Sequence, residues 1–117
     1  MIIDAYKLDR CNNNVKTLVR AGENEFGTIC VNSGHRTQQY NKEVGASNSE
    51  HCKGNAVDIS VPSCHVYKIA GWLLFNIRKY PWSRMAVNIF QNYIHVDFKD
   101  IKVRPYITQY DKNNHWM

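Results

Sequence analysis

The sequence lacks any apolar run long enough to cross a bilayer, so we expect neither a membrane span nor a membrane partner. The opening residues MIIDAYKLDR also lack the basic region and apolar core of a secretory signal. We therefore expect a protein that stays in the cytoplasm or leaves the cell by another route. Internal repeats and low-complexity segments are absent. With 117 residues, 44% hydrophobic and 21% charged, the chain is expected to form a single domain over residues 1–117.

A dense run of Lys and Arg is also missing, although the formal net charge is +5. A positive balance suits nucleic acid, an anionic membrane surface or an anionic polymer such as a bacterial wall, but it is also common on a merely solvated surface. Without a dense basic run we do not expect a nucleic-acid partner. The four cysteines form no CxxC pair, which argues against a zinc ribbon. Their even number permits disulfides, but without a signal segment reduced thiols are expected.

Hydrophobic periodicity predicts an α+β chain. We expect helices over residues 14–22, 38–44 and from Pro62 to before Pro81. Strands are expected over residues 26–31, 56–60, 85–90 and 93–98, the last two joined as a hairpin through Gln91 and Asn92. Residues 1–14 and the tail from Arg104 show no periodicity and are expected to be irregular.

Three residues with metal-binding side chains fall within this pattern: His51 in a polar loop, and Asp58 and His95 in strands. A carboxylate inside a strand flanked by Val57 and Ile59 is unfavourable unless it has a partner, and a metal ion supplies one. Two imidazoles and one carboxylate suit zinc, and three protein ligands leave a fourth position for water, as in catalytic sites. Taken singly, each residue has an ordinary structural explanation, such as a surface histidine or an ion pair. Cys52 is a rival ligand that we expect to point away from the site.

The segment SGHRTQQYNKEVGASNSEHCKGNAVDI, residues 33–59, resembles the SGYRT…N…G…SxHxxGxAxD signature of zinc D-Ala-D-Ala carboxypeptidases and related phage endolysin peptidases. IHVDF, residues 94–98, resembles the HVD segment that completes their site. The hedgehog signalling domain has the same metal-site fold. The resemblance implies a small antiparallel sheet with helices packed on one face, and it implies zinc bound by His51, Asp58 and His95.

The resemblance also implies roles for the residues around the metal. Arg36 would bind the carboxylate of the substrate, because a guanidinium offers a planar fork of donors. Ser49 would form a hydrogen bond near substrate or ligand. Several relatives place an acidic general base three residues before the last histidine ligand, where this chain has Asn92. Asp97 is the substitute base, unless it only orients His95, and Tyr93 would stabilise the oxyanion, unless it only packs.

These features predict a monomeric zinc metallopeptidase that cuts peptidoglycan stem peptides next to a D-amino acid. A carboxypeptidase would use Arg36 to bind a terminal carboxylate, whereas an open cleft would give an endopeptidase of the L-Ala-D-Glu lysin type. We expect a phage-encoded lysin or tail-associated domain, or a cytoplasmic enzyme, that acts at the bacterial cell wall. The alternative is a catalytically inactive, zinc-stabilised binding module.

Overall fold

The computed structural model describes residues 1–35 and 49–117 of the chain. Its elements, in chain order, are β1 (Ile2–Ile3), the 3-10 helix η1 (Ala5–Leu8), α1 (Asn13–Phe26), β2 (Ile29–Ser33), the 3-10 helix η2 (Glu50–Lys53), β3 (Ala56–Ser60), α3 (Val66–Phe75), β4 (Arg84–Asn88), β5 (Tyr93–Asp97) and β6 (Tyr106–Gln109). The helix expected over residues 38–44 lies outside the described residues. Among the residues described, no helix is long and apolar enough to span a bilayer.

The strands form one sheet in the order β1-β2-β3-β5-β4-β6. The central strands pair antiparallel, as predicted. The outer strands pair parallel, β1 with β2 and β6 with β4, so the sheet is mixed and the prediction of an antiparallel sheet was wrong in this respect. Both outer strands lie in segments expected to be irregular. They are short and join the sheet through backbone hydrogen bonds to an existing edge, which no side-chain pattern reports.

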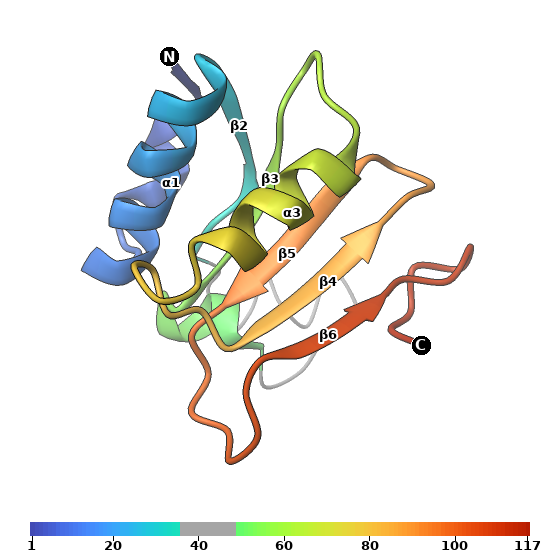
Figure 1. The fold of residues 1–117 in the computed structure, drawn as a ribbon. Helices are drawn as coiled ribbons and strands as arrows, with labels where there is room; N and C mark the ends of the chain where they lie inside the picture. The colour runs from blue at the N-terminus through green and yellow to red at the C-terminus, as the bar shows by residue number, and fades with distance from the viewer. Residues whose placement is uncertain (36–48) are drawn as a thin grey trace.

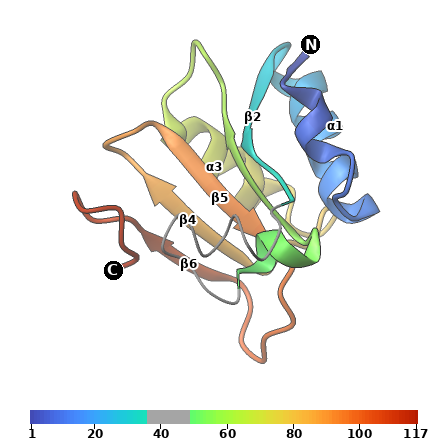
Figure 2. The same ribbon diagram turned by 180° about the vertical axis from the view of Figure 1, so that it is seen from behind.

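Helices α1 and α3 pack on one face of the sheet, as expected (Figure 1). Seen from behind, the sheet lies in front of α3, and η2 lies beside the end of β5 (Figure 2). The hydrophobic core fills the space between the helices and the sheet, where burial of apolar area drives folding. Its fully buried members include Val15, Leu18, Val19, Ile29, Val57, Ile59, Ile69, Leu73, Ile94 and Val96.

The end of α1 differs from the prediction. Gly22 was expected to stop this helix but lies inside it, and the helix continues to Phe26. A Cβ at position 22 would come within 2.8 Å of Ile29 Cδ1, so the glycine allows α1 to approach β2 closely. The stop is Gly27, whose φ of 81° lies in the left-handed region and whose N–H donates to Glu23 O.

Helix α3 begins at Val66 and ends at Phe75, earlier than predicted. Its sheet-facing side chains Val66, Ile69 and Leu73 are fully buried, as the helical spacing indicated. Leu74 was also expected to face the sheet but is 46% exposed, since it sits at the border of the apolar stripe.

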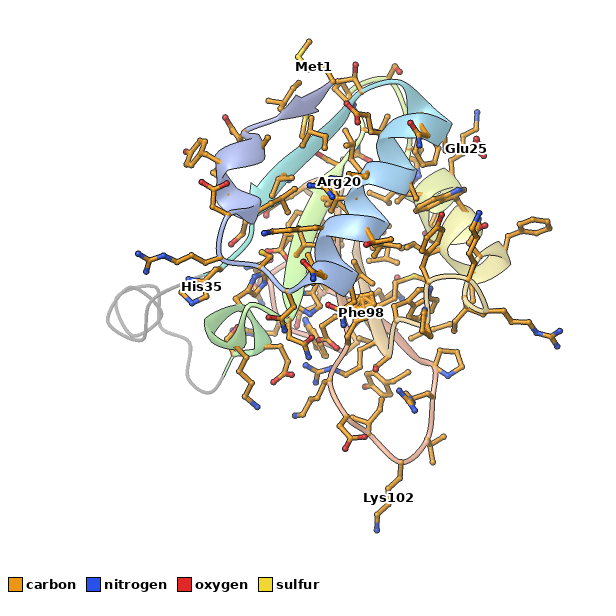
Figure 3. The ribbon with its side chains drawn as sticks, turned by 90° about the vertical axis from the view of Figure 1, so that its left-hand side faces the viewer. Met1, Arg20, Glu25, His35, Phe98 and Lys102 are labelled. Carbon is orange, nitrogen blue, oxygen red and sulfur yellow. The ribbon has the colours of Figure 1, made fainter. Side chains whose placement is uncertain are left out.

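Alternation along β5 creates the two faces that the sequence predicted. Ile94 and Val96 point into the core, whereas His95 and Asp97 point to the opposite face of the sheet. That opposite face is covered in part by Trp116, near the end of the C-terminal segment, residues 106–117. The segment begins as β6 and folds back, with a bridge between Tyr110 and Trp116. Before it, the chain makes a loop whose tip is marked by Lys102 in Figure 3.

Candidate metal centre

His51 is delivered to the site by η2, which begins directly after Ser49. The hydroxyl of Ser49 accepts a hydrogen bond from the His51 backbone N–H at 3.1 Å and so caps this short helix. His51 is 3% exposed, and its Nε2 lies close to Asp58 of β3. Ser49 therefore contacts a candidate ligand through that ligand's backbone, while a contact with substrate stays a prediction.

Asp58 and His95 face each other across the β3–β5 pair. They are register partners in this antiparallel ladder, so their side chains project from the same face of the sheet. His95 Nδ1 lies 2.9 Å from Asp58 Oδ1, and His51 Nε2 lies 3.2 Å from the same oxygen. The three residues predicted to bind metal are thus brought together, although they come from a short 3-10 helix and two strands.

Each imidazole has a second partner on its other nitrogen. His51 Nδ1 is 2.7 Å from the carbonyl oxygen of Gly34, and His95 Nε2 is 2.8 Å from Asp97 Oδ2. Because these oxygens accept hydrogen bonds, each contact favours N–H on the outer nitrogen, which would leave the nitrogen that faces Asp58 available to a metal ion. Metal-binding histidines in proteins are oriented in this way.

Gly34 can lie this close only because it has no side chain. A Cβ at this position would overlap the backbone carbonyl of Lys7 in η1. The glycine in the SGHR segment therefore does more than turn the chain. It allows η1 and the end of β2 to pack together and sets its own carbonyl toward His51.

The charges of the cluster support one another. Burial alone would raise the pKa of Asp58, but hydrogen bonds from His51 and His95 outweigh it and hold that pKa well below its usual range. Burial alone would lower the pKa of His95, but hydrogen bonds to Asp58 and Asp97 raise it to about 9. In the ion-free protein the cluster therefore holds a carboxylate and a protonated imidazole at neutral pH, and a cation can take the place of that proton.

The cluster fits zinc in chemistry and in spacing. The candidate ligand atoms of His51, Asp58 and His95 all lie within 4.8 Å of one another, and all three residues are buried. Zinc bonds of about 2.0–2.1 Å in tetrahedral geometry place ligand atoms about 3.3 Å apart. The two nitrogen–oxygen distances of 2.9 and 3.2 Å are close to this value. The residues present could therefore hold one zinc ion.

Asp97 is held from several sides. Arg84 Nε donates to both of its carboxylate oxygens, at 3.1 and 2.9 Å, and Arg84 Nη2 lies 2.7 Å from Oδ2. The backbone N–H of Lys99 donates to Oδ1. Asp97 is fully buried. Burial would raise its pKa, but His95 and Arg84 outweigh that effect and lower it.

The remaining predicted site residues have different outcomes. The hydroxyl of Tyr93 donates to Asn114 Oδ1 at 3.0 Å, and its ring packs on Tyr110, so a role at an oxyanion stays a prediction. Arg36 and the side chain of Cys52 lie outside the described part of the structure. Asn92 points to the helix side, where it accepts from Val66 N–H and donates to Cys64 O. Its side chain therefore caps α3 instead of facing the metal centre.

Two neighbours of the site escaped the sequence analysis, Arg84 and Trp116. Arg84 begins β4 opposite Asp97, and Trp116 lies at the end of the chain with its ring 5.3 Å from that of His95. An arginine in an apolar strand beside a candidate acidic residue is a signal that could have indicated Arg84. The position of Trp116 depends on how the tail folds back, and we find no sequence signal for it.

The sequence profile described as Peptidase M15 matches residues 4–97 of this chain. Because this match spans most of the chain, the protein belongs to the peptidase M15 family, and the resemblance to zinc D-Ala-D-Ala carboxypeptidases is confirmed at that level. Members of the family are zinc-dependent in general. No curated protein and no solved structure gave a significant match, so the likeness to the hedgehog fold stays a prediction.

Proposed function

We propose that this protein is a zinc-dependent metallopeptidase that hydrolyses the stem peptides of peptidoglycan next to a D-amino acid. The observation that carries the proposal is the buried cluster of His51, Asp58 and His95, with both imidazoles oriented by second partners, in a chain of the M15 family. The net charge of +5 suits an anionic bacterial wall as the place of action. A phage lysin or tail-associated domain is the setting that we expect.

Within this proposal, His51 Nε2, Asp58 Oδ1 and His95 Nδ1 would hold the zinc ion. Three protein ligands would leave room for water or substrate, and the bound ion would supply Lewis-acid chemistry, which lowers the pKa of water and polarises a carbonyl. The protein contributes the orientation of the ligands and a buried environment that strengthens electrostatic interactions. The carbonyl of Gly34 orients the imidazole of His51, and the carboxylate of Asp97 orients that of His95.

For Asp97 we propose the orienting role and not that of the general base. Both of its oxygens already accept hydrogen bonds, and it is fully buried beside Arg84 and His95. Asp97→Asn separates the two roles. Loss of an orienting group weakens zinc affinity as well as turnover, whereas loss of a base lowers turnover and leaves zinc affinity intact.

We propose that Arg36 binds a carboxylate of the substrate, in which case the enzyme is a carboxypeptidase. If the cleft is open at that end, the enzyme is an endopeptidase of the lysin type. Arg36→Ala should keep zinc and thermal stability but lower turnover of substrates with a free terminal carboxylate. Equal turnover by the wild type and Arg36→Ala on those substrates would remove Arg36 from the site.

A digest of purified peptidoglycan by the zinc-loaded protein, analysed by mass spectrometry, tests the proposal. A chelated sample and the His51→Ala variant serve as controls. We expect chelator-sensitive release of D-Ala or of a stem-peptide fragment, and the mass of the product names the bond. If several wall types give no product while the protein still holds zinc, the peptidase proposal fails.

The competing proposal is a zinc-stabilised binding module without catalysis. It is favoured because neither position 92 nor position 97 supplies an obvious general base. Asn92 is an amide whose side chain faces α3, and both carboxylate oxygens of Asp97 already accept hydrogen bonds. Zinc-dependent binding of wall fragments, with no zinc-dependent hydrolysis by wild type or Asp97→Ala, would support this second function. Zinc-dependent turnover by the wild type would exclude it.

A further inference from the structure

Arg84 and Asp97 form an ion pair with fixed geometry next to the metal centre. They are register partners in the β4–β5 ladder, so their backbones hold the two side chains opposite each other. The three nitrogen–oxygen distances of 2.7, 2.9 and 3.1 Å engage both carboxylate oxygens. A guanidinium that engages both oxygens restricts the rotation of a carboxylate far more than one point contact does. Asp97 is thus held in one orientation.

The orientation of Asp97 determines that of His95. Its Oδ2 is the atom that lies 2.8 Å from His95 Nε2, and Arg84 Nη2 contacts the same oxygen. Without Arg84, the fully buried Asp97 would lose its main positive partner apart from His95 itself. An unpaired buried carboxylate is costly, and without the fork of the guanidinium its rotation is less restricted. The acceptor for His95 Nε2–H would then no longer be held in one orientation.

Trp116 covers this pair from the C-terminal segment. The guanidinium carbon of Arg84 lies 4.8 Å from the indole centroid, and the indole also meets the ring of His95 edge to face at 5.3 Å. Trp116 is itself held by its bridge to Tyr110 and by stacking on Tyr106. A cation on an aromatic face is attracted to it, and the indole shields the ion pair from water.

We propose that Arg84 and Trp116 are positioning residues of the metal centre, which act through Asp97 to hold His95 with Nδ1 free to bind the metal. Trp116 lies beyond residues 4–97, which the family profile covers, so the C-terminal segment completes the site. The inference rests on the proposed zinc site but not on hydrolysis. It is therefore testable without an activity assay.

The test measures zinc affinity, by competition with a chromophoric chelator, together with the side-chain ¹⁵N NMR signals of His95 in the zinc-loaded protein. We expect Arg84→Ala to weaken zinc binding about tenfold, as loss of outer partners of metal ligands does. Arg84→Lys should recover only part of this loss, because an ammonium keeps the charge but lacks the fork. In both variants the Nε2–H signal of His95 should exchange faster with water.

Trp116→Ala should weaken zinc binding about threefold, the size of an exposed cation–π contact. In the Arg84→Ala background its effect should be smaller than in the wild type, because Trp116 acts on His95 partly through Arg84 and Asp97 and partly through its own ring contact. Trp72→Ala is the matched control, since Trp72 is another half-buried tryptophan but packs on Phe26 and Tyr80. It should lower thermal stability and leave zinc affinity and the His95 signals unchanged.

The inference is overturned if both Arg84→Lys and Trp116→Ala keep the zinc affinity and the His95 signals of the wild type. It is also overturned if the effects of the substitutions at positions 84 and 116 on zinc affinity are fully additive. If Arg84→Ala does not fold, the zinc affinity and His95 signals of Arg84→Lys test the inference in its place. A wild type without zinc affinity removes the metal centre and this inference with it. A wild type that binds zinc tightly and cleaves no wall peptide removes only the peptidase proposal.

Discussion

Replacement of Asp58 by asparagine removes the negative charge shared by both candidate histidine ligands while keeping the shape of the side chain. Asp58 Oδ1 is the atom that lies near both His51 Nε2 and His95 Nδ1. Asparagine in β3 keeps the packing, but it leaves two imidazoles with a neutral amide. Zinc prefers imidazole, thiolate and carboxylate ligands. We therefore expect Asp58→Asn to lose zinc binding at concentrations that saturate the wild type.

The expected size of the effect follows from linkage. Zinc at a thousand times its Kd stabilises the folded state by about 4 kcal/mol. In a domain of 117 residues, 1 kcal/mol corresponds to a change of about 4 °C in Tm. Zinc should thus raise the Tm of the wild type by about 16 °C and that of Asp58→Asn by less than about 2 °C. With chelator present, the lost charged hydrogen bonds, worth about 1–3 kcal/mol, should lower the Tm of the variant by about 4–12 °C.

Thermal unfolding followed by circular dichroism, with zinc and with chelator, gives both numbers. Asp100→Asn is the matched control, because Asp100 is exposed and its substitution removes the same negative charge outside the site. It should keep the zinc-induced shift of the wild type. If Asp58→Asn keeps the full shift, the ligand set proposed for this site is wrong.

Gly34→Ala should destabilise the protein by about 3 kcal/mol or more in urea unfolding, since its Cβ would overlap the Lys7 carbonyl. Gly71→Ala, in open space on α3, should instead stabilise the protein by up to about 1 kcal/mol. If the two variants have equal free energies of unfolding, the packing described for Gly34 is refuted. The pKa of His95 is raised in the ion-free fold from 6.5 to about 9, so the stability that it contributes is fully present below pH 6.5 and lost as pH rises through about 9. Chelated wild type should therefore become less stable across that window, and a flat profile would contradict the assignment. Asn92→Asp should leave the rate of wall hydrolysis within about twofold, because the side chain faces α3; a large gain in rate would show that position 92 can serve as the base.

The central sheet and its two faces could be predicted from local pattern. Alternation placed Ile94 and Val96 in the core and His95 on the other face, and the structure confirms this. The same alternation in β3 left Asp58 as the one charged residue in a buried strand, which is why it was recognisable as a ligand candidate.

The edges of the fold could not be predicted in this way. Strands β1 and β6 are two and four residues long and carry no alternating pattern. Gly22 looked like a helix stop because glycine is common there, but its contact with Ile29 shows that close packing of α1 on the sheet is the reason for it. Such contacts join residues that periodicity treats separately.

The chemistry of the candidate metal centre is visible in the amino-acid chain before any fold is known. The residue types and spacing of His51, Asp58 and His95 point to a metal site because zinc in proteins is bound by imidazole, thiolate and carboxylate groups, and because an isolated carboxylate in an apolar strand needs a partner.

The way in which these ligands are held depends on the tertiary fold. The ring nitrogen that faces Asp58, the pairing of Arg84 with Asp97 and the cover of Trp116 over His95 all depend on strand register and on the path of the C-terminal segment. These are contacts between residues distant in the chain, and their geometry exists only once the sheet has formed.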